Sequence, residues 1–332
     1  MESPECGDPT GRVMPHAPTP PQGTKLRGVT GVVGAIGKVV VDEVLLCEGP
    51  PAPDTHQNVT RLLTAGGAPA NVASQLAAHA HPAILSGWAG ADAASGEVLA
   101  ALASAGVTLR LTRRDRAPVA TVLAWAGDRA FLVDQGSLRA HSADLNPTWL
   151  DGMAVAHFNG FELLDYCWPD VLAEVAALAH ARGIAVSVDC PTANRMTAQG
   201  TGRFLAALQA MAPDVVFCNA DEAQALGFST RPPWIGLLAV HAGTAPTEVH
   251  GPHGTSRHEV TDVVTEPETT GCGDAFAAGF LAVWAAGGDI ADAVAQAHVW
   301  GAEQARVTGA QPAAAAAAAP DEPTAPSPTR MP

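Results

Sequence analysis

The sequence predicts a three-layer α/β protein with a mainly parallel sheet, helices on both faces of that sheet and a small additional β unit. Two observations support this fold class. Short apolar runs of strand length alternate with stretches of helical periodicity along most of the chain. One region breaks the alternation, because residues 117–133 contain two apolar runs separated by Ala-Gly-Asp-Arg. That pattern is typical of a β-hairpin with its turn near Gly127 and Asp128.

The elements can be assigned in order along the chain. A first strand is expected over Gly31–Gly37, followed by a helix over Pro69–Ala80 with proline in its first turn. A strand over Ala83–Ser86, a helix over Gly96–Ala105 and the hairpin come next. The alternation then resumes with the strand His157–Phe158, the helix Trp168–Ala181, the strand Ile184–Asp189, the helix Gly202–Met211, the strands Val215–Asn219 and Leu237–His241, and the helices Asp274–Ala286 and Ile290–Val307.

Both ends of the chain are expected to lie outside the folded domain. Residues 1–27 are rich in Pro, Gly and Thr, and residues 311–332 contain a run of alanines between prolines. We therefore expect a disordered tail over 1–27, one domain over 28–310 and a second disordered tail over 311–332. The additional β unit is expected to form from about 38–60 and 110–135.

The composition excludes several classes of protein. The chain has 18 Lys and Arg residues against 33 Asp and Glu residues, which gives a formal net charge of -15. Such a chain lacks the basic surface that binds nucleic acid or an anionic membrane. Neither a long apolar run nor a secretory signal is evident. The cysteines are scattered without a C-x-x-C pair, so we expect reduced thiols and a cytoplasmic location.

The strongest candidate site is the segment Thr269–Phe276, which precedes a long apolar helix. Two glycines, Gly271 and Gly273, flank Cys272 and are followed by Asp274. A glycine-rich loop before a helix offers unpaired amides and the helix dipole to an anion. A carboxylate beside that anion is costly unless it acts as a general base for a hydroxyl that attacks a phosphate. The alternative is an ordinary helix cap.

Two further segments stand where ligands often bind. Gly66 and Gly67 allow the backbone to approach a ligand closely, and the amide of Asn71 could hold a hydroxyl. A tight turn with a polar surface residue is the alternative. Asn219 and Glu222 follow a predicted strand and could hold hydrated magnesium. A simple acidic first helical turn is the alternative there.

Two well-known phosphate motifs are excluded. A P-loop needs Gly-Lys followed by Ser or Thr, but Val39 follows Gly37 and Lys38. A dinucleotide fingerprint needs a glycine three residues after its second one, and Phe276 occupies that place after Gly273. An anion bound to this chain would therefore depend on another arrangement.

The ordered set of segments resembles the ribokinase (PfkB) family of carbohydrate kinases. The resemblance extends from about Gly31 to Gln311, with signature segments at Gly37–Asp42, Gly66–Asn71, Gly87–Gly96, Asn219–Glu222 and Thr270–Asp274. It implies a ribokinase-like fold, in which the hairpin and the segment after Asp42 form a lid over the acceptor. It also implies an ATP-dependent kinase acting on a small sugar, most like the fructokinase-type branch. A nucleoside kinase and a catalytically silent binding protein are the alternatives.

The resemblance implies a role for each matched residue. Asp274 would be the general base, with the amides of Gly271, Cys272 and Gly273 around the transferring phosphoryl group. Asn219 and Glu222 would position magnesium, through water. The acceptor would be held by Asp42, Gly66, Gly67 and Asn71. The nucleotide would contact Thr270, Gly243 and His298, together with Asn219 and Glu222. Relatives often use potassium and dimerise through the lid. The resemblance therefore implies K⁺ as a possible cofactor and a homodimer through the lid as a possible assembly.

Several positions depart from the family pattern. Glu268 stands where the family usually has Asp, and Cys272 replaces an alanine. The nucleotide-side segment that begins at Gly243 lacks its second glycine, and His298 stands where relatives often have Asn. The segment Asp189–Arg195 is longer than the usual Asp-x-Asn-x-Arg. These differences concern nucleotide preference and phosphate binding rather than the class of reaction.

Three other features were interpreted from the residues alone. Cys272 lies in an amide-rich loop, from which we expect a lowered thiol pKa and sensitivity to oxidation. The histidines His250, His253 and His258 lie in a Gly- and Pro-rich stretch, which suits a solvated loop better than a metal site. Trp284 and Trp300 are expected in the core.

Overall fold

The computed structural model describes residues 31–125, 128–165 and 167–312. The expected tail over 1–27 lies outside the described residues, as do Gly127 of the hairpin turn and all of the second tail except Gln311 and Pro312. Within the described part, no helix is long and apolar enough to cross a membrane.

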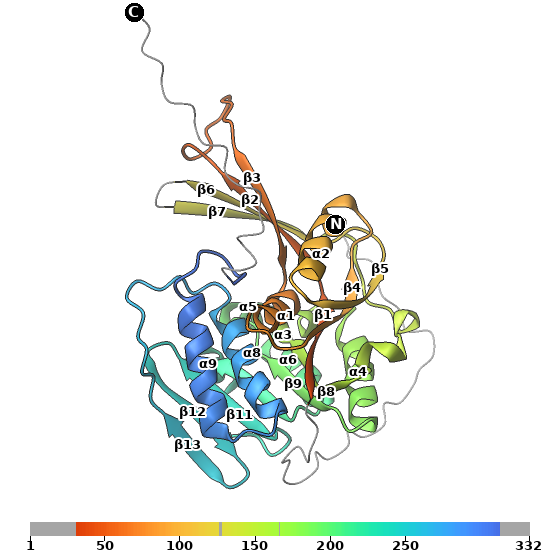
Figure 1. The fold of residues 1–332 in the computed structure, drawn as a ribbon, viewed down its shortest axis with the longest axis vertical. Coiled ribbons are helices and arrows are strands. Elements are labelled where there is room, and N and C mark those ends of the chain that lie inside the picture. The colour runs from red at the N-terminus through yellow and green to blue at the C-terminus, as the bar shows by residue number, and fades with distance from the viewer. Residues whose placement is uncertain (1–30, 126–127, 166, 313–332) are drawn as a thin grey trace, which may run out of the picture.

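A nine-stranded sheet forms the centre of the molecule (Figure 1). Its order is β13-β12-β11-β10-β9-β8-β1-β4-β5. The strands from β11 to β5 pair in parallel, and β12 and β13 are antiparallel additions at one edge. Their bounds are β1 Val32–Lys38, β4 Ala83–Ala89, β5 Thr108–Arg113, β8 Met153–Asn159, β9 Ala185–Asp189, β10 Val215–Asn219, β11 Leu237–Ala242, β12 Ala245–Gly251 and β13 Gly254–His258.

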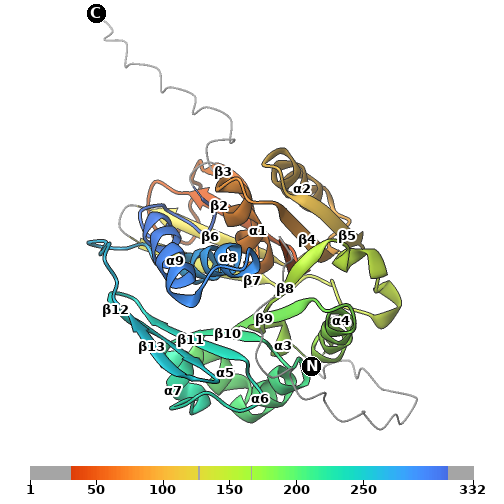
Figure 2. The ribbon, with the colours of Figure 1, turned by 60° about the horizontal axis from the view of Figure 1, so that its bottom comes forward.

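Helices cover both faces of this sheet (Figure 2). One face carries α1 Ala68–Ala78, α2 Ala93–Ser104, α8 Cys272–Ala285 and α9 Ile290–Gln304. The other face carries α3 Gly160–Leu163, α4 Pro169–Ala181, α5 Ala193–Gln199, α6 Thr201–Ala210 and α7 Ala220–Leu226. Short 3-10 turns occupy Ser142–Asp144 and Pro147–Leu150. The predicted three-layer fold is confirmed.

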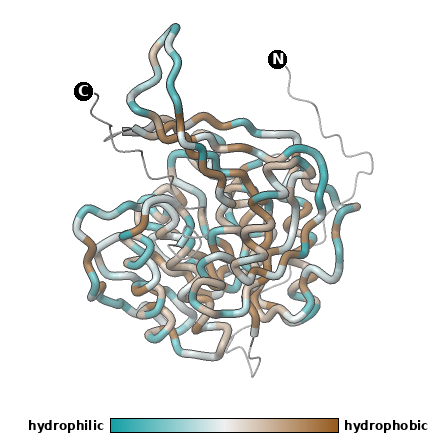
Figure 3. The backbone as a smooth tube through the Cα atoms, turned by 45° about the horizontal axis from the view of Figure 1, so that its top comes forward, coloured by the Kyte–Doolittle hydropathy of each residue, from teal (hydrophilic) through white to brown (hydrophobic). Residues whose placement is uncertain are grey.

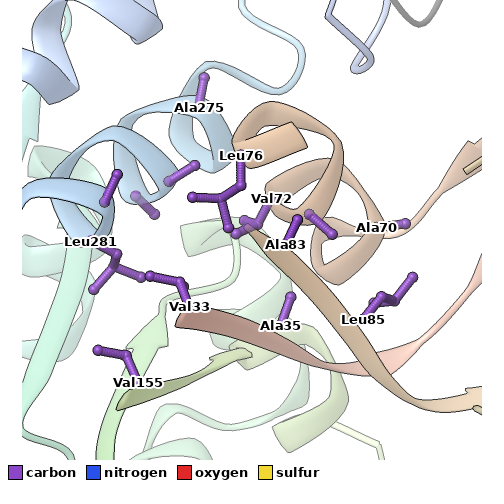
Figure 4. Packing of buried hydrophobic residues seen from close by; sticks show 14 of the residues in the cluster. Val33, Ala35, Ala70, Val72, Leu76, Ala83, Leu85, Val155, Ala275 and Leu281 are labelled. Carbon is purple, nitrogen blue, oxygen red and sulfur yellow. The ribbon is translucent and has the colours of Figure 1, made fainter. Parts of the chain in front are cut away.

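The two cores follow from the alternation of side chains along the strands. Val33 and Ala35 of β1 point toward α1 and α8, where they meet Leu76 and Leu281 (Figure 4). Ile36 of β1 points into the opposite core. Small side chains predominate in α8, which lets it pack closely on α1 and α9. This close packing fixes the beginnings of α1 and α8 side by side, at the carboxyl ends of the strands.

A separate four-stranded sheet forms the lid predicted from the hairpin. Its order is β3-β2-β6-β7, with bounds β2 Val40–Leu46, β3 Thr60–Gly66, β6 Val119–Trp125 and β7 Asp128–Asp134. The lid sheet projects from the body beside the carboxyl ends of the central strands (Figure 1). Its projecting end is hydrophilic, whereas hydrophobic segments gather toward the body (Figure 3). The predicted lid range of 110–135 included most of β5, which instead pairs with β4 in the central sheet.

Two local expectations differ from the structure. His250 and His258 lie on strands β12 and β13, with His253 in the turn between them, so this stretch is an edge hairpin rather than a solvated loop. Gln311 was assigned to the tail, yet it is 8% exposed and hydrogen-bonded to residues near α1. The ordered structure therefore continues past residue 310 to Pro312.

Candidate active site

Gly271 shapes the loop that leads into α8. It is the residue before the helix and has a φ of 77°, in the left-handed region that favours glycine. A Cβ at Gly271 would lie 2.8 Å from the carbonyl oxygen of Ala310. The amide of Cys272 donates to Thr269 over 3.3 Å, whereas in the described part of the chain no acceptor is recorded for the amide of Gly273. This start of α8 therefore presents an amide and the helix dipole to an anion.

Asp274 lies in the first turn of α8, beside that amide. Its Oδ2 accepts a hydrogen bond of 2.8 Å from Asn71 Nδ2 of α1. Burial raises the pKa of Asp274 to about 7; the Asn71 hydrogen bond opposes this shift and the charge of Glu162 adds to it. A carboxyl group with this pKa can accept and release a proton near neutral pH, as a general base must.

Gly66 and Gly67 bring the lid strands close to the start of α1. A Cβ at Gly66 would lie 2.2 Å from Asp42 Oδ1, so the carboxyl group of Asp42 lies directly over this glycine. Gly67 has a φ of 86°, and a Cβ there would lie 2.9 Å from the carbonyl oxygen of Lys38. Burial raises the pKa of Asp42 to about 6. Asp42, Gly66, Gly67 and Asn71 thus come together with Asp274 in what we call the acceptor cradle, after the role that the family resemblance implies for them.

Glu162 borders the acceptor cradle and was missed by the sequence analysis. It lies on α3 just after β8, is 3% exposed and accepts a hydrogen bond of 3.4 Å from the backbone amide of Lys38 at Oε1. Its Oε2 has no hydrogen-bond partner among the described residues. Burial raises the pKa of Glu162, and the nearby charge of Lys38 opposes that shift. An acidic residue four positions after the end of the predicted strand His157–Phe158 was the available signal.

Asp189 is a second buried acid that the sequence analysis did not assign to the site. It ends β9 and is 8% exposed, and its Oδ2 would lie 3.8 Å from a Cβ at Gly273. Burial raises its pKa well above the usual value, and the charges of Asp274 and Glu222 raise it further. Its place at the carboxyl end of a parallel strand could have identified it.

Asn219 and Glu222 form the cap of α7 and lie near Asp189. Asn219 Oδ1 accepts from the Glu222 amide over 2.9 Å, while the two carboxylate oxygens of Glu222 accept from the amide and the side chain of Asn219 over 2.8 and 2.7 Å. Burial raises the pKa of Glu222 to about 7. Both oxygens of Glu222 are therefore engaged in the cap. No group of three or more His, Cys, Asp or Glu side chains suited to a metal ion occurs in the described part of the chain.

A mostly apolar pocket opens beside the loop that leads into α8. It measures about 730 Å³ including its open mouth, and its lining includes Gly243, His298, Thr269 and Cys272. His241 and His298 flank Phe276, with ring centroids 4.9 and 5.9 Å from it. Burial lowers the pKa of His241 to about 4, so its ring is neutral at physiological pH. A mostly apolar pocket lined by aromatic rings is suited to bind another aromatic ring.

The predicted nucleotide residues therefore separate into two groups. Gly243 lies in the turn between β11 and β12 with a φ of 58°, and His298 Nε2 is 2.8 Å from Thr247 Oγ1, so both belong to the pocket. Thr270 instead directs its amide and hydroxyl toward Glu268, over 3.1 and 2.7 Å.

The expectation of an activated thiol at Cys272 is wrong. Burial, with the charges of Glu268 and Asp274, raises the pKa of Cys272 to about 11. Its Sγ donates to the carbonyl oxygen of Glu268 over 3.3 Å. Burial and the neighbouring carboxylates outweigh the positive end of the helix, so this thiol stays protonated.

Comparisons with known proteins found similar sequences and similar folds. The pfkB family carbohydrate kinase description matches residues 32–317. A protein of Halopiger xanaduensis named ATP-dependent ribose-1-phosphate kinase is 32% identical over 279 residues, which are 80% of this chain and 89% of that protein. Similar solved structures include an adenosine kinase from Sinorhizobium meliloti, with a TM-score of 0.72, 19% identity and coverage of 85% of this chain and 96% of that chain. A nucleoside kinase from Methanocaldococcus jannaschii has a TM-score of 0.69 at 18% identity, covering 86% and 96%.

Proposed function

Because the chain belongs to the pfkB family of carbohydrate kinases, we propose that it transfers the γ-phosphoryl group of ATP to a hydroxyl of a small sugar. The observation that carries this proposal is the position of Asp274. Its carboxyl group lies in the first turn of α8, 2.8 Å from Asn71 Nδ2, with a pKa of about 7. A base with this pKa beside an amide-lined anion site is what phosphoryl transfer to an alcohol requires.

In this proposal each part of the site has a task. Asp274 accepts the proton of the attacking hydroxyl, and the amide of Gly273 with the dipole of α8 stabilises the charge on the phosphoryl group. Asp42, Gly67 and Asn71 orient the acceptor hydroxyls. The lid sheet closes over the acceptor and excludes water, which suppresses hydrolysis of ATP. The nucleotide base occupies the pocket lined by Gly243 and His298.

The residues around Glu222 fit magnesium held through water. Both carboxylate oxygens of Glu222 are engaged with Asn219, so a water-mediated ion would leave the cap of α7 intact. Ionised Glu222 and Asp189 together would supply the negative charge that attracts the ion, and a bound cation would lower both raised pKa values. Magnesium, when bound, neutralises charge on the phosphates of the nucleotide.

The substitution Asp274→Asn tests this proposal. Asparagine keeps the shape of the side chain but cannot accept the proton, so we expect kcat to fall by on the order of 10³-fold or more while ATP still binds. Asp292→Asn is the matched control, because Asp292 is an exposed acid in the first turn of α9. Isothermal titration with ATP and a coupled kinase assay supply the two readouts. Undiminished phosphoryl transfer by Asp274→Asn would refute the mechanism.

A second candidate acceptor is a pentose that already carries a phosphate group. It is favoured by the relative named ribose-1-phosphate kinase, and by Lys38, whose backbone borders the acceptor cradle at both Glu162 and Gly67. Lys38 Nζ lies 3.5 Å from Asp165 Oδ2 and 5.1 Å from the ring centre of Trp168. A local cation of this kind can hold a phosphomonoester on a strongly acidic protein.

One screen separates the acceptors. ATP consumption is measured with ribose, fructose, ribose 1-phosphate, adenosine and inosine, each with magnesium. Preference for ribose 1-phosphate that is lost in Lys38→Met and kept in Lys38→Arg would identify the phosphorylated pentose. Preference for free sugars or nucleosides would assign the acceptor to that class, and ATP binding without transfer to any of them would favour a binding protein.

A further inference from the structure

Gln311 connects the last described residues of the chain to the acceptor cradle. Its Nε2 donates to the carbonyl oxygen of Ala65 over 2.7 Å and to Asn71 Oδ1 over 2.8 Å. Asn71 Nδ2 in turn donates to Asp274 Oδ2 over 2.8 Å. Gln311 and Asn71 are 8% and 6% exposed. Three side chains from distant parts of the chain thus form one series of hydrogen bonds, which is buried at Gln311 and Asn71 and partly buried at Asp274.

From this series we propose that Gln311 is a positioning residue of the site, which fixes the side-chain amide of Asn71 with its nitrogen toward Asp274. The proposal rests on the role of Asp274 given above. It assigns a function to a residue that the sequence placed in the C-terminal tail.

The carbonyl oxygen of Ala65 determines which atom donates and which accepts in each hydrogen bond of this series. The carbonyl oxygen of Ala65 can only accept, so the group of Gln311 that faces it must be the NH₂. The second hydrogen of that NH₂ then points at Asn71, which must present its oxygen. The nitrogen of Asn71 is left to face Asp274. A backbone carbonyl of lid strand β3 therefore sets the orientation of the amide that contacts the general base.

Without Gln311, the amide of Asn71 would have two orientations of nearly equal shape. Turning it by 180° exchanges its oxygen and nitrogen and places an oxygen against Asp274. That arrangement favours the protonated carboxyl group, because only a protonated oxygen can donate to the amide oxygen. Glu162 of α3, Asp189 at the end of β9 and Cys272 on α8 also interact electrostatically with Asp274, and they are unchanged by a substitution at 311.

The test combines substitutions at 311 and 71. Gln311→Met keeps the length of the side chain and removes its hydrogen bonds, and Gln311→Glu makes the group an acceptor only. We expect the acid limb of the kcat/KM profile to move up by about half to one pH unit in both variants, with a larger shift for Gln311→Glu. In an Asn71→Ala background, Gln311→Met should cause no further shift.

Gln75→Met is the matched control for loss of a buried glutamine. Gln75 lies one turn after Asn71 on α1, is 1% exposed and donates to Gln304 Oε1 over 2.6 Å. Its loss should lower the melting temperature without moving the acid limb. The proposal would be overturned if Gln311→Met left the pH profile unshifted. It would also be overturned if Gln311→Met shifted the profile as much in the Asn71→Ala background as in the wild type.

A second readout keeps this test separate from the proposed kinase activity. The titration of Asp274 can be followed by NMR of the protein labelled with ¹³C at aspartate carboxyl groups, with Asp274→Asn used to assign the signal. Gln311→Met should raise the pKa of Asp274 in the free protein, whether or not a sugar is phosphorylated. An unchanged titration would overturn the role of Gln311, whereas absence of phosphoryl transfer by the wild type would refute only the proposed function.

Discussion

Asp274 lies among several other acidic side chains whose pKa values are also raised. The others gather at the carboxyl ends of the central strands and on the adjoining lid strand: Asp42, Glu162, Asp189 and Glu222. Burial is the main cause in each case, and few cations are available in a chain with a net charge of -15. These carboxyl groups therefore bind protons more readily than exposed carboxyl groups do, and a bound cation would oppose that.

The raised pKa of Asp274 predicts the pH dependence of the reaction. The base must be ionised, and burial favours its protonated form up to about pH 7. As the pH falls below 7, kcat/KM should therefore fall about tenfold per unit. The measurement is kcat/KM for the acceptor from pH 5 to 9 with saturating ATP and magnesium. A profile that stays flat down to pH 5 would contradict the assignment of Asp274 as the base.

The thiol of Cys272 should react slowly with alkylating reagents. With a pKa of about 11, it is ionised at pH 8 in only on the order of one molecule in 1,000. Iodoacetamide labelling at pH 8 followed by peptide mass spectrometry measures the rate, with free glutathione as the reference. Labelling of Cys272 faster than glutathione would show that the helix dipole outweighs burial and the two neighbouring carboxylates.

The sequence located those site residues that stand in local patterns. Glycines stand close in the sequence to Asp274, Asn71 and Asp42. A side chain at these glycines would collide with a nearby backbone or carboxyl group, so the sequence motif marks the place where the chain packs closely. Glu162 and Gln311 carry no such pattern. Their importance comes from which side chains the folded chain places against them, across 124 residues to Lys38 and 240 residues to Asn71. Periodicity and spacing do not encode contacts of that range.

At the scale of elements, Gly66 joins lid strand β3 to α1 and makes room for Asp42. Replacing it with alanine puts a Cβ 2.2 Å from Asp42 Oδ1, so the carboxyl group must move away from the acceptor cradle. We expect Gly66→Ala to raise KM for the acceptor by on the order of tenfold or more, with KM for ATP little changed. Steady-state kinetics for both substrates measure this split.

Gly202→Ala is the control for that substitution. Gly202 lies in α6, and a Cβ there would have no atom within 4 Å. Alanine is also the better helix former, so both KM values should be unchanged and the melting temperature equal or higher. An unchanged acceptor KM in Gly66→Ala would mean that Asp42 does not touch the acceptor.

Edge elements were the least predictable from the sequence. The buried parallel strands β8 and β10 are apolar over most of their length, and the sequence identified both. Strands β12 and β13 are polar, partly exposed and rich in Gly and Pro at their ends, because they are the antiparallel edge of the sheet. Their composition resembles a loop, and only the hydrogen bonds of β12 to β11 and of β13 to β12 make them strands.

At the scale of the whole molecule, the parallel sheet explains how the site is assembled. Strands β1, β8, β9 and β10 point the same way, so the residues that follow them meet at one end of the sheet. The lid sheet and the beginnings of α1 and α8 lie at that end too (Figure 1). The residues proposed to bind the acceptor, the phosphoryl group and the nucleotide are thereby adjacent, although they span positions 42 to 311.

The lid sheet carries exposed apolar side chains on the face that also bears Asp42. Strand register places Val133 beside Ala120, and Ala120 beside Asp42, so these three residues share one face. Leu46 and Leu62 belong to the same face, since they are an even number of residues from Asp42 and from its partner Thr64. Leu46, Leu62 and Val133 are 43%, 37% and 59% exposed. Such a surface is costly in water unless the acceptor or another molecule covers it.

We expect two copies of the chain to cover these faces mutually, giving a homodimer through the lid. Val133→Asp places a charge on the covered face and should convert the dimer to a monomer, as measured by light scattering coupled to gel filtration. Leu132→Asp is the matched control, because Leu132 is 58% exposed but points to the opposite face of the same strand. It should leave the mass unchanged. The dimer would be wrong if the wild type and both variants had the mass of one chain. If Val133→Asp then raised only the KM for the acceptor, the apolar face would instead belong to the closed lid of a monomer.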